Sequence, residues 1–590
     1  MSVDLVTRLE QHGREIPGKE AVVFVRTTAT GPVKEPLTYG ELDRRARSLA
    51  SWLRERCAIG DRVMLLYGTG PEFISTLAAC MYAGVVAVPA PQPSTQRGHS
   101  SRSDGIVRDA GIRLVLTDAA THEDACAFLA DAGPAELPCV ATDLLELPDA
   151  PHWQVPPVNA GTPVIIQYTS GSTSSPKGVV VTHGSLAHNL GLNARAFGVD
   201  ADSRTCSWLP QHHDMGLIGM LLTPLYQGGT AFKLASMDFL RRPHVWLELI
   251  GRERIHTVVA PNFAYDLCTR RVTDAQLAGL DFSSLINAGN GAEPVSADTL
   301  RRFAERFAPA GFRPEHFSPC YGMAETTLIV SGTGPGEAPV LLPVDGDALA
   351  ANEIRPVPAG AGTPTLVSSG TVHDLSVLIV DPVTRQTLPD GRIGEIWVRG
   401  ASVGAGYWRN EEATEHTFRA VTAEGSEGYL RTGDTGSLYE GRLYVTGRIK
   451  EVLVINGRNL YPHDIERELA SMFDGFQGLS GSVCSVPAGG DGATAGVGEQ
   501  LVVMHEVRRA GADADELAAL ARRMRAELAT RVGVGVPHLL LLRPGQIRKT
   551  TSGKVQRTLM RKLYLSGELE PLAADRSAAA ARRPDTAGAA

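Results

Sequence analysis

The sequence lacks long apolar runs, closely spaced cysteines and an excess of basic residues, and each absence excludes a class of protein. No apolar stretch approaches the ~18 residues that a membrane-spanning helix needs, so we expect no membrane span. The eight cysteines lie far apart without a CxxC pair, which argues against a disulfide framework and a cysteine-based zinc site. A formal charge of -8 argues against nucleic-acid binding through phosphate neutralisation.

The start of the chain and its composition are those of an ordinary globular protein. The segment MSVDLVTRLEQHG places charges every few residues and has no apolar core, so it does not resemble a signal peptide. With the scattered cysteines, this predicts a cytoplasmic protein. Hydrophobic residues make up 43% and charged residues 21% of the 590 positions. This length predicts about three to five structural units.

Short apolar, β-rich segments alternate with helical patterns over most of the first 450 residues. The clearest helical patterns are 37–56 and 295–310. This alternation predicts an α/β fold in which mixed, largely parallel sheets are flanked by helices. The expected strands are 21–25, 62–67, 85–90, 112–117, 163–169, 256–261 and 284–289.

The pattern changes near residues 428–470, where closely spaced turns separate short strands, as in antiparallel hairpins. Helical and strand patterns then continue to about residue 570 and predict a compact α+β unit. Residues 571–590 contain almost no core-forming side chains, so we expect a disordered tail. The segment 346–370 is rich in Gly, Pro, Ala and Ser and is long for a connection, which is typical of functional or disordered loops.

The strongest chemical signal is YTSGSTSSPKGVVVTHGSL at 168–186. A predicted strand leads into small or hydroxylated residues from Ser170 to Ser175, followed by Pro176 and Lys177. Small residues let backbone N–H groups approach an anion, hydroxyls add donors, and the lysine adds positive charge, which together suit a triphosphate. The spacing differs from that of a Walker loop, which the sequence lacks. A polar hairpin turn with an exposed lysine is the alternative.

A second motif is SPCYGMAETTLIVSG at 318–332. Its Tyr-Gly pair can stack on a flat base, and Glu325 offers a hard oxygen ligand for phosphate-bound Mg²⁺. For this segment alone, a buried tyrosine and a surface glutamate would be the better explanation.

Two further motifs lie near the boundary and in the C-terminal unit. Asp434, in a Thr-Gly-Asp turn, could accept two vicinal hydroxyls, and Arg448 follows in a Gly-Arg-Ile-Lys turn. A surface salt bridge explains this pair equally well. In RKTTSGKVQRTLMRKL (548–563), Lys554 precedes a basic helix, a pattern that is usually a solvated charge run.

Taken in order, these motifs resemble the signature set of the adenylate-forming enzymes over roughly residues 20–565. That superfamily contains acyl-CoA synthetases, luciferases and the adenylation domains of peptide synthetases. Other segments look like those of the fatty acyl-AMP ligases, namely 208–229, 260–272, 287–295, 312–332 and 400–418. One departure is Ser174, which stands where the superfamily usually has glycine; altered phosphate contacts are expected at most.

The resemblance implies an enzyme that uses ATP and Mg²⁺ to convert a fatty acid to its adenylate, with release of pyrophosphate. The acyl group would then pass to the phosphopantetheine thiol of an acyl carrier protein, in lipid, polyketide or lipopeptide biosynthesis. It also implies a large domain over 1–447, a hinge at 448–450 and a small mobile domain over 451–570. The segment 346–370 falls about where this branch carries an insertion thought to prevent efficient use of CoA.

The resemblance also implies residue roles. Lys554 would bridge the substrate carboxylate and the α-phosphate, Glu325 would hold Mg²⁺, and Lys450 would belong to the hinge. His213 is expected to shape the junction of the nucleotide and acyl pockets rather than to transfer protons, with Met215 and Gly216 beside it. The acyl tunnel is expected between 208–229 and 258–266. The implied ATP- and AMP-binding residues are Thr169, Ser170, Gly171, Ser172, Thr173, Lys177, Asn290, Gly291, Ala292, Tyr321, Gly322, Met323, Asp434 and Arg448.

Two other classes of protein are alternatives to a fatty acyl-AMP ligase. An acyl-CoA synthetase would differ in its acyl acceptor, so a comparison of CoA with a carrier protein distinguishes it from a fatty acyl-AMP ligase. A catalytically silent binding protein is disfavoured, because it would not require Lys177, Glu325, Asp434 and Lys554 together.

Overall fold

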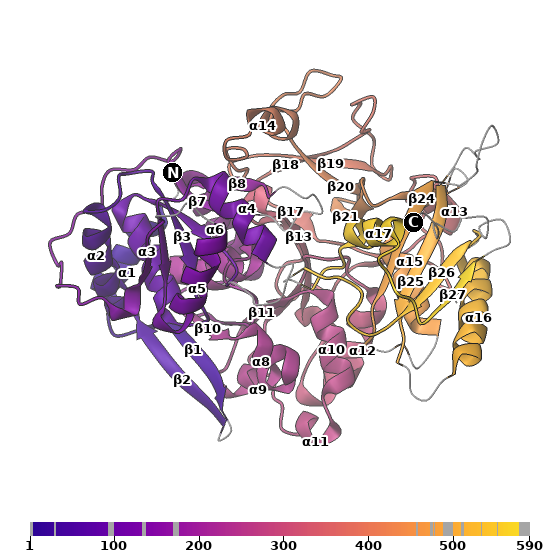
Figure 1. Ribbon diagram of the computed structural model, residues 1–590, viewed down its shortest axis with the longest axis horizontal. Coiled ribbons are helices and arrows are strands. Elements are labelled where there is room, and N and C mark those ends of the chain that lie inside the picture. Colours follow the sequence, from indigo (N-terminus) through magenta and orange to yellow (C-terminus); the bar gives the residue numbers. More distant parts are fainter. Residues whose placement is uncertain are drawn as a thin grey trace, which may run out of the picture.

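The computed structural model describes residues 4–28, 31–92, 100–132, 137–168, 176–360, 362–455, 458–472, 476, 478–487, 499–508, 513–532, 534–550 and 553–576. Two large sheets with helices between and outside them occupy the N-terminal part of the chain (Figure 1). A smaller sheet with its own helices carries the C-terminal part, which is drawn in orange and yellow.

In the described residues, the largest sheet has nine strands in the order β17-β14-β13-β12-β11-β9-β10-β1-β2. Its centre, from β13 to β1, is parallel, and its two edges are antiparallel. The strands are β1 (Glu20–Thr28), β2 (Gly31–Thr38), β9 (Arg204–Ser207), β10 (Thr230–Leu234), β11 (Thr257–Ala260), β12 (Asn287–Asn290), β13 (Phe317–Gly322), β14 (Ile329–Gly332) and β17 (Thr371–Val372).

A second sheet runs β6-β5-β3-β4-β7-β8 through the described chain. It is parallel except for the pairing of β7 with β8. Its strands are β3 (Arg62–Leu66), β4 (Val86–Pro89), β5 (Leu114–Thr117), β6 (Cys139–Ala141), β7 (Pro163–Tyr168) and β8 (Gly178–Thr182). All of the strands expected from the sequence are present in the two sheets, and the mixed, largely parallel α/β architecture is confirmed.

Side-chain caps explain where the two clearest helices begin. Thr38 Oγ1 accepts a hydrogen bond from the Glu41 N–H at the start of α2, and Ser296 Oγ accepts one from the Thr299 N–H at the start of α12. The helices before the C-terminal part are α1 (Leu5–Glu15), α2 (Tyr39–Arg54), α3 (Pro71–Ala83), α4 (Ser100–Ala110), α5 (Ala119–Ala132), α6 (His183–Phe197), α7 (Thr223–Gln227), α8 (Ser236–Arg241), α9 (His244–Arg252), α10 (Asn262–Arg271), α11 (Asp274–Leu277), α12 (Ala297–Phe307), α13 (Gly346–Ala350) and α14 (Glu411–Phe418).

Irregular helical turns complete this part of the chain. A π-helix, η2 (Met215–Leu222), leads directly into α7. Short 3₁₀ turns are η1 (Thr142–Leu144), η3 (Ala308–Ala310), η4 (Pro314–His316) and η5 (Ala324–Thr326). None of the helices in the described ranges combines the length and the apolar character that a bilayer crossing requires.

Alternate residues of each central strand face different cores, which arranges the helices in layers. In β3, Leu65 belongs to the core between the two sheets, whereas Met64 faces the core under α4 and α5. In β1, Phe24 faces the core between the sheets, and Val23 faces the core that includes α9, α10 and α12. Helices α1, α2, α3 and α6 fill the layer between the sheets.

Two further groups of described strands are an antiparallel sheet and the strands of the C-terminal α+β unit. The antiparallel sheet contains β18 (Ser376–Val380), β19 (Gly394–Arg399), β20 (Leu430–Tyr439) and β21 (Arg442–Arg448). The C-terminal unit contains the hairpin β22 (Leu453–Ile455) and β23 (Arg458–Leu460), the sheet of β24 (Gly481–Pro487), β25 (Glu499–Glu506), β26 (His538–Leu542) and β27 (Ala573–Arg576), and the helices α15 (Pro462–Met472), α16 (Ala514–Val532) and α17 (Arg557–Ser566).

The end of the described chain corrects one expectation. Residues 571–590 were expected to be disordered, but β27 pairs antiparallel with β26, and Asp575 forms an ion pair with Arg525 on α16. Backbone hydrogen bonds alone can hold an edge strand in place. A segment with few core-forming side chains can therefore still form one. Residues 577–590 lie outside the described ranges.

The segment 346–370 contains regular structure. It begins with α13, and its strand β16 (Thr365–Val367) pairs antiparallel with β15 (Leu341–Pro343). Leu349 of α13 packs in a small core with Val344 and Tyr444. Helix α13 also lies against β23 of the C-terminal unit. The segment therefore contains an ordered helix that contacts the C-terminal unit.

Candidate functional site

A cavity of about 1290 Å³ lies where the large sheets, the β20–β21 hairpin and the C-terminal unit meet. Most of the described residues implied by the sequence line it, although they come from segments far apart in the chain. These are Lys177, His213, Met215, Ala292, Tyr321, Gly322, Met323, Glu325, Asp434, Arg448, Lys450 and Lys554. Asn290, Gly291 and Gly216 lie next to lining residues without belonging to the lining themselves.

The predicted phosphate loop can be located only by its flanks. Thr169, Ser170, Gly171, Ser172 and Thr173, together with Ser174, lie outside the described residues. Tyr168 at the end of β7 and Lys177 before β8 flank these residues, and both line the cavity.

The Asp434 carboxylate is held from two sides. Its Oδ1 lies 2.8 Å from Arg448 Nε, and its Oδ2 accepts a hydrogen bond from Tyr321 Oη at 2.8 Å. The Asp434 side chain is 6% exposed and that of Arg448 is 52% exposed. The Asp434 carboxylate raises the pKa of Arg448, and burial together with Asp434 raises the pKa of Tyr321. The pair is therefore a buried acid with a fixed orientation and not an ordinary surface salt bridge.

The Glu325 carboxylate also lines the cavity and is buried. Its Oε1 accepts a hydrogen bond from Tyr407 Oη at 2.9 Å, and burial raises the pKa of Glu325. Lys177 Nζ lies 4.8 Å from the centre of the Tyr407 ring, so this ring links the lysine beside the phosphate loop to the carboxylate. A buried carboxylate whose ionised form is disfavoured is suited to a divalent cation.

Lys554 reaches the same cavity from the C-terminal unit. Burial and the nearby Arg448 lower the pKa of Lys554, while the carboxylates of Asp214, Asp434 and Glu293 act in the opposite direction. The preceding residue, Gly553, has φ of +87°, and a Cβ there would lie 3.0 Å from the ring of Phe263. The loop that carries the lysine therefore packs closely on α10.

The predicted adenine-binding segment follows the carboxyl end of β12. A Cβ on Gly291 would lie 2.8 Å from Cys320 Sγ, and Ala292 has φ of +67°, which is rare for a residue with a side chain. Asn290 Nδ2 donates a hydrogen bond to Asn262 Oδ1 at 3.3 Å. This close approach fixes the turn that leads from β12 into the cavity wall.

His213 lies beside Asp214 in the cavity wall. Its Nδ1 lies 2.6 Å from Asp214 Oδ1, and both residues line the cavity. Burial alone would raise the pKa of Asp214, but the charge and hydrogen bond of His213 lower it overall. A Cβ on Gly216 would lie 2.3 Å from the Pro210 carbonyl oxygen, so the turn into η2 requires glycine.

Both segments expected to form the acyl tunnel contribute to the cavity wall. Met215, Gly219 and Met220 come from 208–229, and Val259 and Phe263 come from 258–266. The wall also includes Asn193 of α6, whose side-chain Nδ2 is buried without a hydrogen-bond partner in the described residues.

The sequence did not indicate a role for three residues that lie at the site. Glu293 Oε1 accepts a hydrogen bond from the Phe263 N–H at 2.6 Å, and burial raises the pKa of Glu293. Asp214 and Tyr407 lie inside segments that resembled the family, but nothing in their spacing assigns a partner. Tyr407 contacts Glu325, which is 82 residues away in the chain, and the contact between Asp214 and His213 depends on the turn into η2. A single sequence therefore carries no local signal for either contact.

A family model described as AMP-binding enzyme matches residues 9–408, and the chain belongs to this family. It is 37% identical over 543 residues to the medium-chain fatty acid–acyl carrier protein ligase JamA of Moorena producens, covering 90% of each chain. It is 35% identical over 589 residues to the 4-hydroxyphenylalkanoate adenylyltransferase of Mycobacterium tuberculosis, covering 96% of this chain and 93% of that one.

A solved structure is also similar to this chain. A fatty acyl-adenylate ligase from Legionella pneumophila, in complex with acyl adenylate and pyrophosphate, matches with a TM-score of 0.74 and 34% identity. The match covers 97% of this chain and 98% of that one. Within the AMP-binding enzymes, the chain belongs to the fatty acyl-AMP ligase branch.

Proposed function

We propose that this protein uses ATP to convert a fatty acid to its acyl adenylate, releases pyrophosphate, and transfers the acyl group to the phosphopantetheine thiol of an acyl carrier protein. The observation that carries the proposal is the meeting of Lys177, Glu325, Asp434 and Lys554 around one cavity whose wall continues into apolar side chains. Relatives whose names specify an acyl carrier protein ligase and a structure holding acyl adenylate support it.

The first half-reaction needs charge neutralisation more than proton transfer. A fatty acid has a pKa near ~4 and is already a carboxylate at neutral pH. Its oxygen attacks the α-phosphorus of ATP, the bond from that phosphorus to the bridging oxygen breaks, and pyrophosphate leaves with the electron pair. Two anions must therefore approach each other in line, which preorganised cations favour.

The residues around the cavity have chemistry that suits this task. Lys554 would contact the carboxylate and the α-phosphate, and Lys177 would contact the terminal phosphates together with the undescribed loop at 169–175. Asp434 would accept the ribose hydroxyls, because Arg448 and Tyr321 already fix its orientation. A Mg²⁺ ion held by Glu325 would screen the phosphate charge; the buried carboxylate, with its raised pKa, fits such an ion.

A mobile C-terminal domain accounts for the second half-reaction. Lys554 faces the cavity in this structure, so the thiol can reach the adenylate only after the domain rotates about a hinge at 448–450, the turn that follows β21. We propose that 346–370 is the branch-specific insertion. Its helix α13 touches β23 of the moving unit and would restrict the orientations that serve CoA.

The acyl acceptor tests the proposal. The protein is incubated with ATP, Mg²⁺ and dodecanoate, and with either CoA or a holo-acyl carrier protein, across a series of chain lengths. Labelled pyrophosphate should exchange into ATP in the presence of the acid, and acyl-carrier protein should form much faster than acyl-CoA. Rapid acyl-CoA formation with the carrier protein ignored would instead identify an acyl-CoA synthetase, and failure of pyrophosphate exchange with every acid would exclude both.

A further inference from the structure

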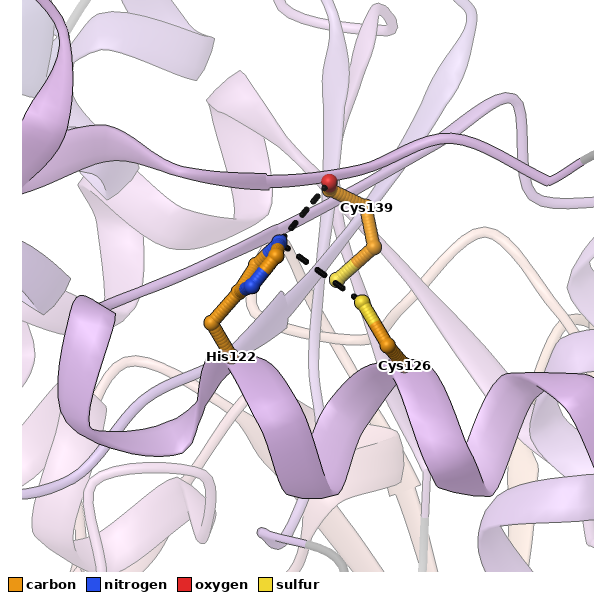
Figure 2. A group of neighbouring side chains, drawn as sticks. All are labelled: His122, Cys126 and Cys139. Carbon is orange, nitrogen blue, oxygen red and sulfur yellow. Dashed lines mark hydrogen bonds between the residues drawn. The ribbon is translucent and has the colours of Figure 1, made fainter.

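A cluster of three metal-binding side chains lies outside the cavity, at the β6 edge of the second sheet. His122 and Cys126 are four residues apart on α5, so they share one face of the helix. Cys139 is the first residue of β6, which is an edge strand in the described chain. Figure 2 shows the imidazole and both thiols pointing toward a common point, and their ligand atoms all lie within 4.8 Å of one another.

The separation of these atoms matches that of ligands on one ion. Zinc binds sulfur at ~2.3 Å and imidazole nitrogen at ~2.0–2.1 Å, so a sulfur and a nitrogen on a tetrahedral zinc lie about 3.6 Å apart. The distance from His122 Nε2 to Cys126 Sγ is 3.6 Å. Nε2 also lies 3.3 Å from the Cys139 carbonyl oxygen, a contact that a bond from Nε2 to the metal would replace (Figure 2).

We propose that His122, Cys126 and Cys139 bind a zinc ion, with water in the fourth position. Thiolate and imidazole are typical ligands of zinc, whereas magnesium and calcium prefer oxygen ligands. Cys126 is exposed, so solvent can reach the metal and fill the open position. His122 would bind through Nε2, leaving the proton of a neutral ring on Nδ1.

The position of the cluster indicates a structural role. None of its members lines the cavity, and α5 and β6 are joined by a connection whose residues 133–136 lie outside the described ranges. An ion held by both elements would fix the edge strand to the helix that covers the sheet. Spacing along the chain argued against a cysteine-based zinc site, because the two cysteines are not adjacent; the fold brings them together.

A disulfide between Cys126 and Cys139 is the competing interpretation. Both thiols are free in this structure, and a disulfide would need an oxidant and would leave the convergent imidazole without a role. A metal ion uses all three groups and needs no change in oxidation state.

Cobalt(II) provides a direct probe, since it replaces zinc in tetrahedral sites and its spectrum reports thiolate ligands. The full-length protein is reduced, freed of metal with a chelator, and titrated with Co²⁺. We expect the thiolate-to-cobalt absorption to saturate at one ion per chain and to disappear when Zn²⁺ is added. Zn²⁺ should also protect Cys126 and Cys139 from alkylation by iodoacetamide, as measured by peptide mass spectrometry in the unaltered protein.

Variants separate the cluster from the other thiols. The double variant Cys126→Ser/Cys139→Ser should lose the absorption, and His122→Ala should weaken metal binding at least about tenfold, the loss that even an outer partner of a metal ligand causes. Cys484→Ala, in the core of the C-terminal unit, is the control and should bind as before. Pyrophosphate exchange should be unchanged in His122→Ala, which checks that the variant is folded.

Three results would overturn the inference. They are no uptake of Co²⁺ by the reduced protein, absorption that survives in the double cysteine variant, and alkylation of both cysteines that Zn²⁺ leaves unaltered. Any one of them shows that the three side chains do not form a zinc site.

Discussion

Arg448 Nε lies 2.8 Å from Asp434 Oδ1, and the two residues face each other directly across the antiparallel strands β20 and β21. The other carboxylate oxygen accepts a hydrogen bond from Tyr321. A carboxylate that is fixed on both oxygens keeps lone pairs available for a ligand, and it loses little freedom when the ligand binds. This arrangement explains why an acid in a turn can act as an anchor for vicinal hydroxyls.

The first prediction concerns this carboxylate. Asp434→Asn should raise the KM for ATP about 10- to 100-fold, because hydrogen bonds to a charged group contribute about 1.5–3 kcal/mol. The KM for the fatty acid should change much less. Pyrophosphate exchange at varied ATP measures the effect, and Asp390→Asn, at an exposed position, is the control. An unaltered KM for ATP in Asp434→Asn would show that the carboxylate does not contact the nucleotide.

The second prediction separates the two half-reactions. Lys554→Ala should slow acyl-AMP formation about 10²–10³-fold, the usual cost of losing one preorganised contact to the developing charge. Transfer from synthetic acyl-AMP to holo-carrier protein should be retained, because the proposed domain rotation would move the lysine out of the cavity before the thiol enters. Lys562→Ala, exposed on α17, should affect neither step. Undiminished adenylation in Lys554→Ala would refute the assignment of this lysine.

The third prediction follows from the pKa of Lys554, which burial and Arg448 lower from its usual value. The ammonium group is the useful form, so kcat/KM for adenylation should fall as the pH rises through this lowered pKa. The fall should therefore begin below the ~10.4 expected of an ordinary lysine. In Lys554→Arg the guanidinium stays charged, so the alkaline fall should be absent in whatever activity remains. Identical alkaline limbs in the two proteins would assign the fall to another group.

The sequence was sufficient to predict much of the fold and many of the residues that line the cavity. Strands such as β3 and β11 are recognisable because they are short, continuously apolar and bounded by turns, and α12 is recognisable because Ser296 caps it. The site motifs are local as well: each places its functional side chain within a few residues of a glycine turn. These strands, caps and motifs can be recognised in a single sequence because the residues that cause each of them lie within one segment.

Other features depend on contacts between distant segments, and the sequence does not reveal them. Tyr407 contacts Glu325 across 82 residues, and the imidazole of His122 meets Cys139 only because α5 packs beside β6. The composition of residues 571–590 predicts a tail and not the strand at Ala573–Arg576, because edge pairing depends on the backbone and not on composition. In each case the partner is supplied by tertiary structure.

The fourth prediction concerns the close contact between the lysine loop and α10. Gly553→Ala would place a Cβ 3.0 Å from the Phe263 ring at a φ of +87°. The clash with the ring, added to left-handed strain of roughly 1–2 kcal/mol, should displace the loop and reduce adenylation about 5- to 30-fold. Gly545→Ala is a matched control, because Gly545 also has φ of +87° but open space around it.

Two outcomes distinguish the contact from general strain. If docking of the loop on Phe263 matters, Gly553→Ala should lose adenylation while transfer from synthetic acyl-AMP is retained, and Gly545→Ala should keep both activities. Equal losses in the two variants would mean that backbone strain in the C-terminal unit, and not the contact with α10, controls the rate.

The last prediction compares two buried asparagines one turn apart on α6. Asn189 Nδ2 donates hydrogen bonds to the carbonyl oxygens of Thr326 and Ile329 and to Ser402 Oγ, whereas Asn193 Nδ2 has no partner in the described residues. Removing a satisfied amide leaves its former partners buried and unpaired, which costs about 1–3 kcal/mol, while replacing an unpaired one removes a desolvation cost. Asn189→Leu should therefore lower the free energy of unfolding, and Asn193→Leu should leave it unchanged or raise it.

Activity adds a second measurement for the same pair. Asn193 lines the cavity, so Asn193→Leu makes the wall more apolar and should lower the KM for dodecanoate without changing the KM for ATP. Urea denaturation and pyrophosphate exchange on the two variants test both parts. If Asn193→Leu loses as much stability as Asn189→Leu, the Asn193 amide must be hydrogen-bonded in solution. The expected gain in affinity for the plain acyl chain would then have no physical basis.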